Sequence, residues 1–263
     1  QMAALVIFGV SMIALYTTSG VYHLINLGKR AILFMKKLDH SMIFVLIAGT
    51  YTPIIVFLLT GDFRVFMLSL IWGIALGGIA GYFGGLSDDI ISRVIDLFLS
   101  FPSMIFALAI VGALGSSVLN LIMALALVHW ASYARLMRGQ VLSAKSNDYV
   151  SSARVIGASD RRILVKHILP NALAPVIVLA TLDMGHVILS AAALSFLGLG
   201  IPPSVPEWGS MLNAGKEFMR TAPYLTLFPG MAITLTVILF SLLGDGFQEI
   251  LDPESEVSGL VAA

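Results

Sequence analysis

Long apolar runs constrain this chain more than any other feature of its sequence. Residues 3–27, 171–198 and 223–246 are almost wholly apolar, and runs of roughly 20 such residues cross the hydrocarbon core of a bilayer as helices. Backbone polar groups find no water in lipid, so a spanning segment is either a helix or part of a closed barrel. Barrel strands alternate polar and apolar residues over about 10 positions, and these runs do not alternate. The sequence therefore predicts an all-α integral membrane protein.

Composition agrees with this class and excludes others. Of the 263 residues, 58% are hydrophobic and 11% are charged, whereas soluble domains carry about 25% charged residues. The formal net charge is zero, so the whole-chain charge balance says nothing about nucleic acid, and we expect no nucleic-acid partner. The lack of cysteine excludes disulfides and thiolate chemistry. The chain begins at Gln1 inside an apolar run, and we predict no signal peptide there because no basic segment or small-residue cleavage site accompanies the run.

The apolar runs predict about seven transmembrane helices. Their expected ranges are 3–27, 40–60, 63–83, 91–113, 117–135, 171–198 and 223–246. Most of the fifteen Lys and Arg residues lie in two loops, one after the first predicted span and one after the fifth. An even number of spans separates these loops, so both lie on one face, which the positive-inside rule assigns to the cytoplasm.

The second of these loops, residues 136–170, ends in the stretch "DYVSSARVIGASDRRILVKHILP". Residues 140–156 favour a helix that Gly157 ends. Ser159 can cap a second helix, with Asp160 at its positive end, and that helix runs into Pro170. The small residues around Gly157 leave a shallow face on which a partner protein can pack. The alternative from composition alone is a surface helix pair whose basic residues bind anionic lipid headgroups.

The spacing of this loop resembles the coupling loop of ABC importer permeases, written E-A-A, three residues, G, then nine residues before I-x-L-P. Ser151 and Ser152 replace the glutamate and the first alanine, and His167 replaces the isoleucine. Three further stretches resemble the dipeptide, oligopeptide and nickel permeases in the same order, so that the resemblance covers residues 79–263. They are "IAGYFGGLSDDIISRVIDLFLSFPSMIFALAIVGALG", "ALALVHWASYARLMRGQVLS" and "ALSFLGLGIPPSVPEWGSML".

The resemblance implies a type I ABC importer permease-like core in the C-terminal part, in the inner membrane of a bacterium. It implies as partners cytoplasmic ABC ATPase subunits, a second permease subunit, an extracytoplasmic solute-binding protein and membrane lipid. The sequence lacks the Walker A pattern G-x-x-x-x-G-K-[ST], so we expect a transporter subunit that is not itself an enzyme and uses no cofactor. The residues expected to contact the ATPase are Tyr149, Ser151, Ser152, Ala153, Gly157, Ala158, Ser159, Leu169 and Pro170.

The N-terminal part resembles a different family. "TSGVYHLI" and "KLDHSMIFVLIAGTYTPI" are similar to the haemolysin III family, relatives of the adiponectin and progestin receptors. In that family a serine, histidines and an aspartate surround a zinc ion, and Ser19, His23 and Asp39 occupy three of the positions. The H-x-x-x-H pattern that completes the site is lacking, so we expect an incomplete zinc site and no bound metal. His23 then serves as an interfacial histidine at the end of a span.

These two resemblances predict a fusion of a three-helix fragment, residues 1–75, with a permease domain, residues 79–263, joined somewhere in 61–81. Within the sixth span, Asp183 and His186 are three residues apart and share a helix face. Ionisable residues inside a membrane mark transport paths, so we expect these two to line the pathway, with a mutual hydrogen-bonded pair as the alternative. The leading function is import of peptides or nickel. The alternatives are a haemolysin III-like zinc-dependent membrane hydrolase or receptor fragment, and a non-functional hybrid.

Overall fold

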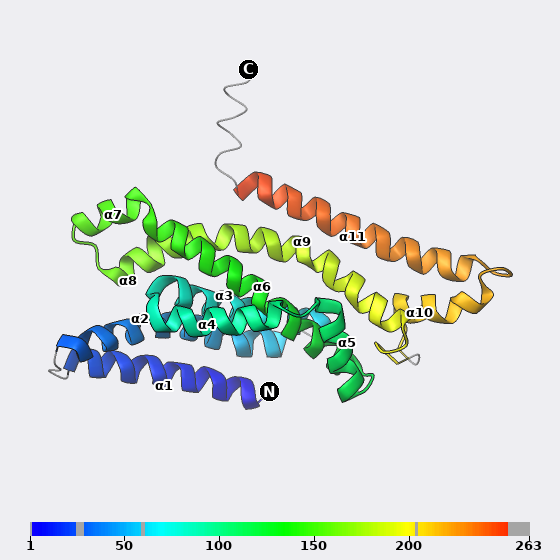
Figure 1. Cartoon of the computed structure of the whole chain (residues 1–263), viewed down its shortest axis with the longest axis horizontal. Helices are drawn as coiled ribbons and strands as arrows, with labels where there is room; N and C mark the ends of the chain where they lie inside the picture. Colours follow the sequence, from blue (N-terminus) through cyan, green and yellow to red (C-terminus); the bar gives the residue numbers. More distant parts are fainter. Residues whose placement is uncertain (1, 25–28, 59–60, 203–204, 252–263) are drawn as a thin grey trace, which may run out of the picture. The chain divides into compact units, whose positions relative to one another are not determined.

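A computed structural model describes the backbone of residues 2–24, 29–58, 61–202 and 205–251, and the side chains within these ranges except 23, 24, 29, 30, 56–58 and 61–66. All regular structure in these ranges is helical (Figure 1), which confirms the all-α prediction for them. The long helices are α1 (Met2–Leu24), α2 (Lys29–Leu58), α3 (Gly61–Phe83), α6 (Val118–Ser146), α9 (Leu169–Phe196) and α11 (Tyr224–Leu251). The shorter helices are α4 (Gly85–Leu99), α5 (Ser103–Leu114), α7 (Asp148–Val155), α8 (Asp160–Ile163) and α10 (Trp208–Gly215). A π-helical turn covers Leu164–Ile168 and a 3₁₀ turn covers Lys216–Phe218.

The helices belong to two compact units. The first comprises residues 1–100 and 129–173, and the second comprises residues 101–128 and 174–263. Helices α6 and α9 therefore contribute residues to both. Each unit is described by itself below.

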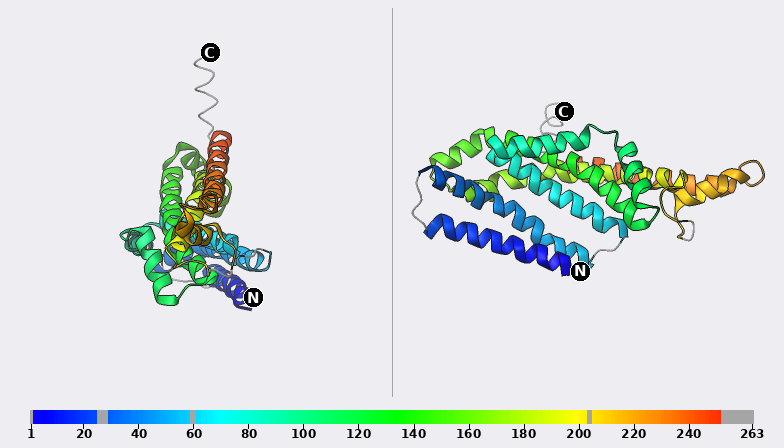
Figure 2. Two further views of the ribbon diagram at one scale, coloured as in Figure 1. Left: turned by 90° about the vertical axis from the view of Figure 1, so that its right-hand side faces the viewer. Right: turned by 60° about the horizontal axis from the view of Figure 1, so that its bottom comes forward.

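In the first unit, α1, α2 and α3 lie side by side (Figure 2). Small residues permit the close approach of these helices, as is common in membrane proteins. A Cβ atom at Gly49 of α2 would overlap the side chain of Ser11 on α1. On the other side of α2, the ring of Phe44 packs where a Cβ at Gly78 of α3 would lie, and Phe44 is only 2% exposed. The three N-terminal helices thus form one packed layer.

A second face of α3 packs against the C-terminal half of α6. Gly73, Gly77 and Gly81 recur every fourth residue and so form one stripe along α3. Cβ atoms at these positions would press on the backbone carbonyl oxygens of Trp130, Ala134 and Arg138, respectively. Helix α3 therefore holds α2 through one glycine and α6 through three others.

Helix α4 turns back from α3 through two glycines with positive φ, Gly84 at 63° and Gly85 at 59°. It is fixed to α6 by ion pairs, because both carboxylate oxygens of Asp88 accept hydrogen bonds from the guanidinium of Arg138. The Arg138 Nη2 to Asp88 Oδ2 distance is 2.8 Å. Phe98 of α4 also meets Trp130 edge to face, with ring centroids 5.1 Å apart. These contacts hold α4 against α6 within the first unit.

The second unit has its own core, formed where α5, the N-terminal part of α6 and the C-terminal part of α9 meet. The core residues are all buried: Ala107, Val111, Leu121, Ala124, Leu125 and Leu194. The segment after α9 is tied back to it, since Ser195 Oγ accepts a hydrogen bond from the Ile201 amide at 3.2 Å. Glu207 then caps α10, because its two carboxylate oxygens accept from the amides of Gly209 and Ser210 at 2.8 Å.

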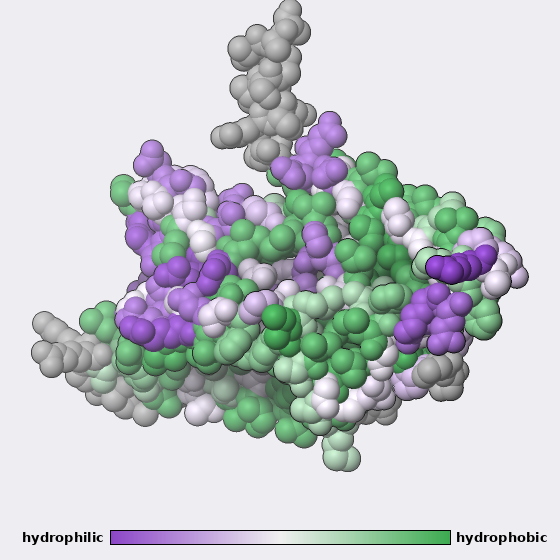
Figure 3. Space-filling model, turned by 45° about the vertical axis from the view of Figure 1, so that its right-hand side comes forward, coloured by the Kyte–Doolittle hydropathy of each residue, from purple (hydrophilic) through white to green (hydrophobic). Residues whose placement is uncertain are grey.

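Four helical stretches in the described residues are long and apolar enough to cross a membrane, or up to five when α4 and α5 count as one broken span. Hydrophobic side chains cover much of the face shown in Figure 3. The predicted span 91–113 is divided, because Pro102 lacks an amide hydrogen and disfavours helical backbone at Phe101. The predicted spans 40–60 and 63–83 reach into residues whose side chains are not described, and Met67–Phe83 is the described apolar helix of the latter.

Candidate functional site

The loop between α6 and α9 is a helical hairpin, as the sequence predicts, but its first helix is shorter than expected. The predicted helix over residues 140–156 is wrong, because Asn147 has an extended backbone and separates α6, which ends at Ser146, from α7. α7 begins after Asn147, whose backbone is extended, and carries Asp148 in its first turn, where the helix dipole favours a negative charge. Val150 is fully buried and holds α7 against the rest of the first unit. Helix α7 is therefore anchored on one side and open on the other.

The turn after α7 is a glycine-ended helix cap. Gly157 has a φ of 86°, a left-handed conformation that side chains with a Cβ rarely adopt. The amide of Ala158 donates to the Ala153 carbonyl and the amide of Gly157 donates to the Arg154 carbonyl, both at 3.0 Å. These two bonds constitute the Schellman motif. The predicted helix stop at Gly157 is confirmed.

The second helix of the hairpin also begins where the sequence predicted. Ser159 has an extended backbone, and its side chain accepts a hydrogen bond from the Arg162 amide at 3.4 Å. α8 passes directly into the π-helical turn, in which the Leu169 amide donates to the Leu164 carbonyl. Pro170 follows, and a proline cannot donate the next helical hydrogen bond, so the wider π turn accommodates it. The chain stays helical from Asp160 to Phe196.

Buried apolar residues attach the second helix to the first unit, while α7 presents an exposed face. Ile163, Leu164 and Ile168 are fully buried. On α7 and its cap, Val155 is 89% exposed and Ile156 is 85% exposed. All nine residues that the sequence predicts for ATPase contact are exposed or half-buried, on the hairpin or at the start of α9: Tyr149, Ser151, Ser152, Ala153, Gly157, Ala158, Ser159, Leu169 and Pro170.

The sequence interpretation missed Val155 and Ile156, although both are visible in the sequence as bulky apolar residues directly before the predicted helix stop. Apolar side chains this exposed, next to a rigid turn, are typical of a surface that a partner covers. The small residues make the face shallow, and these two residues give it protruding hydrophobic groups.

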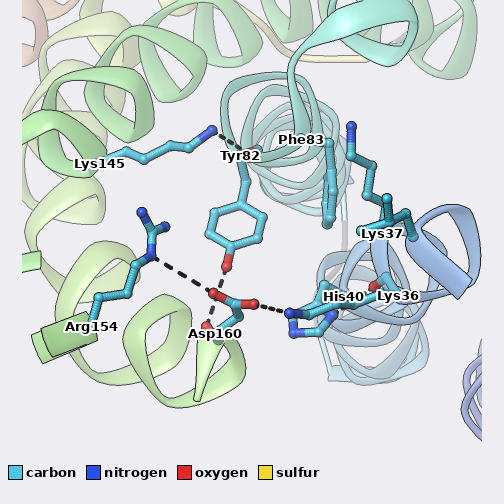
Figure 4. A pocket seen from close by; sticks show the side chains of 9 residues that line it. Lys36, Lys37, His40, Tyr82, Phe83, Lys145, Arg154 and Asp160 are labelled. Carbon is cyan, nitrogen blue, oxygen red and sulfur yellow. Dashed lines mark hydrogen bonds and ion pairs between the residues drawn. The ribbon is translucent and has the colours of Figure 1, made fainter. Parts of the chain in front are cut away.

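A set of polar contacts joins the hairpin to α2 and α3, and the sequence did not predict it. Lys36 Nζ of α2 lies 2.5 Å from Asp160 Oδ2, and Arg154 Nε of α7 lies 3.9 Å from Asp160 Oδ1. The Tyr82 hydroxyl donates to the Asp160 carbonyl at 3.3 Å. Lys145 Nζ of α6 donates to the Tyr82 carbonyl at 2.7 Å. Figure 4 shows Arg154 and the Tyr82 hydroxyl directed at Asp160, the first residue of α8, and Lys145 directed at the Tyr82 backbone.

The charges of this contact set are mutually stabilised. Both Lys36 and Asp160 lie outside the predicted spans. The hydrogen bond from Lys36 holds the pKa of Asp160 below its ordinary value of 3.8. The same hydrogen bond raises the pKa of Lys36 above 10.5. The two side chains are partly exposed, at 42% for Lys36 and 28% for Asp160, so the pair contributes modestly to stability.

The zinc-site candidates do not assemble a site in the described residues. Ser19 of α1 and Asp39 of α2 are half-buried, and the side chain of His23 lies outside the described residues. The ring of His40 donates from Nδ1 to the Lys36 carbonyl at 2.7 Å, and Asp39 Oδ2 lies 3.9 Å from that nitrogen. Among the residues that the structure describes, no group of three or more His, Asp or Glu side chains is arranged to hold a metal ion.

The two pathway candidates lie on α9 in the second unit. Asp183 is half-buried and His186 is exposed. Both side chains therefore have part of their surface uncovered. Their role in lining the transport pathway stays a prediction.

Two protein families match this chain, each over a different range of residues. Residues 73–257 match the family described as binding-protein-dependent transport system inner membrane component. Residues 1–138 match the haemolysin-III related family. The two matches overlap over residues 73–138.

Curated relatives agree with the first match. The chain is 47% identical over 186 residues to a dipeptide transport system permease protein, DppC, of Alkalihalophilus pseudofirmus, covering 71% of this chain and 61% of the relative. It is 43% identical over 197 residues to a glutathione transport system permease protein, GsiD, of Pectobacterium atrosepticum, covering 75% of this chain and 65% of the relative. The chain thus spans less than two thirds of the length of these relatives.

A solved structure shows the same fold. A chain of the MetNI methionine ABC transporter, in inward-facing conformations, superimposes with a TM-score of 0.54 at 17% sequence identity. The match covers 73% of this chain and 93% of the other. The predicted permease-like fold is therefore confirmed. This multi-pass membrane protein belongs to the family of binding-protein-dependent transport system inner membrane components, and its N-terminal part belongs with the haemolysin-III related proteins.

Proposed function

We propose that the chain is a permease subunit of an ABC importer for peptides or nickel, and that the hairpin of α7 and α8 seats in a cytoplasmic ATPase subunit. The observation that carries this proposal is the exposed apolar pair Val155 and Ile156, held at a glycine-ended helix cap on the face that basic residues assign to the cytoplasm. The names of the relatives favour peptides as the solute.

The continuity of the helix after the hairpin supports a mechanism of alternating access driven by ATP hydrolysis in the partner subunits. Residues 160–196 form one helical stretch, and α8 is attached to it without a loop. Movement of a docked ATPase would displace α7 and α8 and be transmitted into α9. Asp183 and His186 lie on this helix, so we propose that they line the solute path it helps to open.

The proposed importer also requires other partners. A second permease subunit would complete the pathway, an extracytoplasmic binding protein would deliver the solute, and the assembly would lie in the bacterial inner membrane. ATP hydrolysis belongs to the separate ATPase subunits in this proposal.

We further propose that the chain is a fusion, joined within residues 61–81. Helix α3 covers this range and packs against two helices. Gly78 contacts Phe44 of α2, and the stripe of Gly73, Gly77 and Gly81 contacts the backbone of α6. A helix that packs on both sides in this way can join two membrane fragments without exposing a gap. Matches to two different families, over residues 1–138 and 73–257, support a chain of mixed origin.

The proposal is tested by co-purification of the chain with the ATPase subunit of a dipeptide importer. Ile156→Asp places a charge in the docking face and is expected to reduce the recovered ATPase at least about tenfold, as for a central interface residue. Leu86→Asp is the matched control, because Leu86 is also apolar and 75% exposed but lies in the first turn of α4, outside the hairpin. Equal recovery with both variants contradicts docking through this face.

The second candidate function rests on the haemolysin-III match. A zinc-dependent membrane hydrolase or receptor fragment requires about one zinc per chain, lost in His23→Ala. Elemental analysis of the purified protein distinguishes the two candidates. Protein that carries no zinc and recovers no ATPase would instead indicate a non-functional hybrid.

A further inference from the structure

A cationic cavity opens beside the hairpin, within the first unit. Its volume is about 240 Å³, which is ample for an anion larger than a single water. Five helices contribute to its lining: α2, α3, α6, α7 and α8. Figure 4 shows the side chains around it.

Positive charge dominates the lining. Lys36 and Lys37 come from α2, Lys145 from α6 and Arg154 from α7, while Asp160 is the one carboxylate in the lining. Four cations and one anion leave a net charge of +3 when His40 is neutral. Asp160 already accepts from Lys36 and also has Arg154 Nε at 3.9 Å, so its charge is matched within the site. Like charges gathered from separate helices repel one another unless an anion joins them.

The rim of the cavity is apolar on one side. Leu33 lines it and is 62% exposed, and the neighbouring Phe34 is 61% exposed. A site with cationic groups inside and exposed apolar groups at its edge suits an amphiphile whose anionic head enters the cavity while its chains lie along the helix. Basic pockets between membrane helices on the cytoplasmic side bind lipid phosphates in this manner.

We propose that this cavity binds a phosphate-bearing anion, with the phosphate held by Lys37, Lys145 and Arg154. Lysine supplies point charges, and arginine supplies paired donors for phosphate oxygens. The source is either the headgroup of an anionic phospholipid or free phosphate, and the apolar rim favours the lipid. The inference depends on the proposed function only for the cytoplasmic placement of the hairpin.

Because the bound anion contacts α2, α6 and α7 together, it would stabilise the hairpin on the N-terminal helices. The expected effect is measured as the thermal unfolding midpoint of the full chain in phosphatidylcholine nanodiscs. One arm adds phosphatidylglycerol to the bilayer, and the other adds inorganic phosphate to the buffer. A rise in the midpoint in the first arm alone identifies a lipid headgroup, and a rise in the second identifies free phosphate.

Variants separate this cavity from general attraction to an anionic surface. Lys37→Gln with Arg154→Gln removes two lining cations and leaves Lys36 on Asp160, whereas Arg161→Gln with Lys166→Gln removes the same charge from exposed positions outside the lining. The first pair should weaken retention of phosphatidylglycerol, counted by native mass spectrometry, about fivefold or more for each cation removed. The second pair should leave it unchanged.

Charge-conserving Lys37→Arg with Arg154→Lys controls for misfolding and should retain the lipid. The proposal is overturned by a midpoint that responds to neither anion, or by equal loss in the lining and control pairs. Neither readout involves an ATPase or transport, so failure here is distinguishable from failure of the proposed import function.

Discussion

Lys36 Nζ lies 2.5 Å from Asp160 Oδ2, so a residue of the haemolysin III-like part is paired with the first residue of α8 in the permease part. Tyr82 adds a hydrogen bond to the same residue's carbonyl. The hairpin that we propose to bind an ATPase is therefore held by the N-terminal helices. Any motion transmitted through the hairpin must move or break this contact.

Lys36→Met is expected to loosen the hairpin without unfolding the protein. The pair is partly exposed, so its coupling with Asp160 should be no more than about 1 kcal/mol. A double-mutant cycle with Asp160→Asn, followed by thermal unfolding, measures that coupling. Lys37→Met is the matched control. Lys37 is the adjacent lysine of the same helix, and Lys36 is the lysine paired with Asp160, so the control should lower the unfolding midpoint less. Coupling equal to zero within error contradicts a structural role for the pair.

The contribution of this pair should depend on pH at both extremes. The pKa of Lys36 is raised in the folded state, so its contribution is full below about pH 10.5 and is lost as the pH rises through the folded value. The pKa of Asp160 is lowered, so its contribution is lost as the pH falls below 3.8 through the folded value. The difference in unfolding midpoint between wild type and Lys36→Met should be constant from about pH 5 to pH 9 and shrink outside that window. If the difference in unfolding midpoint changes between about pH 5 and pH 9, a titratable group other than Lys36 and Asp160 controls it.

Gly77→Ala should destabilise the packing of α3 on α6. The added methyl would overlap the Ala134 carbonyl oxygen, and overpacking of this kind costs about 1–3 kcal/mol. Gly139→Ala of α6 is the control, because a Cβ there meets nothing within 4 Å, and its better helix propensity should add up to about 1 kcal/mol. Unfolding in detergent distinguishes them. Equal midpoints for the two variants would show that the glycine stripe is not closely packed.

Gly157→Ala should strain the turn between α7 and α8. The φ of 86° is left-handed, and a residue with a Cβ loses about 1–2 kcal/mol in that region. Gly157→Asn is the control, since asparagine tolerates the conformation better. Limited proteolysis at the hairpin should be faster for the alanine variant than for the asparagine variant. The reverse order would contradict the glycine-ended cap.

Local features of the hairpin were predictable from sequence, and contacts between distant segments were not. Gly157 and Ser159 are recognisable because helix stops and caps depend on nearby backbone groups. The break at Phe101 and Pro102 carried the same kind of local signal, but the apolar run around it favoured a single span. Lys36 and Asp160 gave no such signal, because their pairing depends on how α2 and α8 are packed rather than on spacing within either.

The exposed residues Val155 and Ile156 illustrate a second limit. Apolar residues in a membrane protein are expected to face lipid or core, so their composition does not distinguish them from the rest of the chain. Only the structure shows that Val150 occupies the buried side of α7 while Val155 and Ile156 stay uncovered. The sequence pattern therefore points to the small residues as the contact face and gives no signal for the bulky residues beside them.

The most direct test of the central claim uses the lack of native cysteine in this chain. Ile156→Cys introduces a single thiol, which a short bifunctional maleimide can link to a cysteine placed in the groove of a co-expressed ATPase subunit. We predict cross-linking at position 156 and none from Leu86→Cys. The contradicting result is that an impermeant maleimide, added outside intact cells, labels residue 156 while no cross-link to the ATPase forms. That result would contradict docking of the hairpin on the cytoplasmic face.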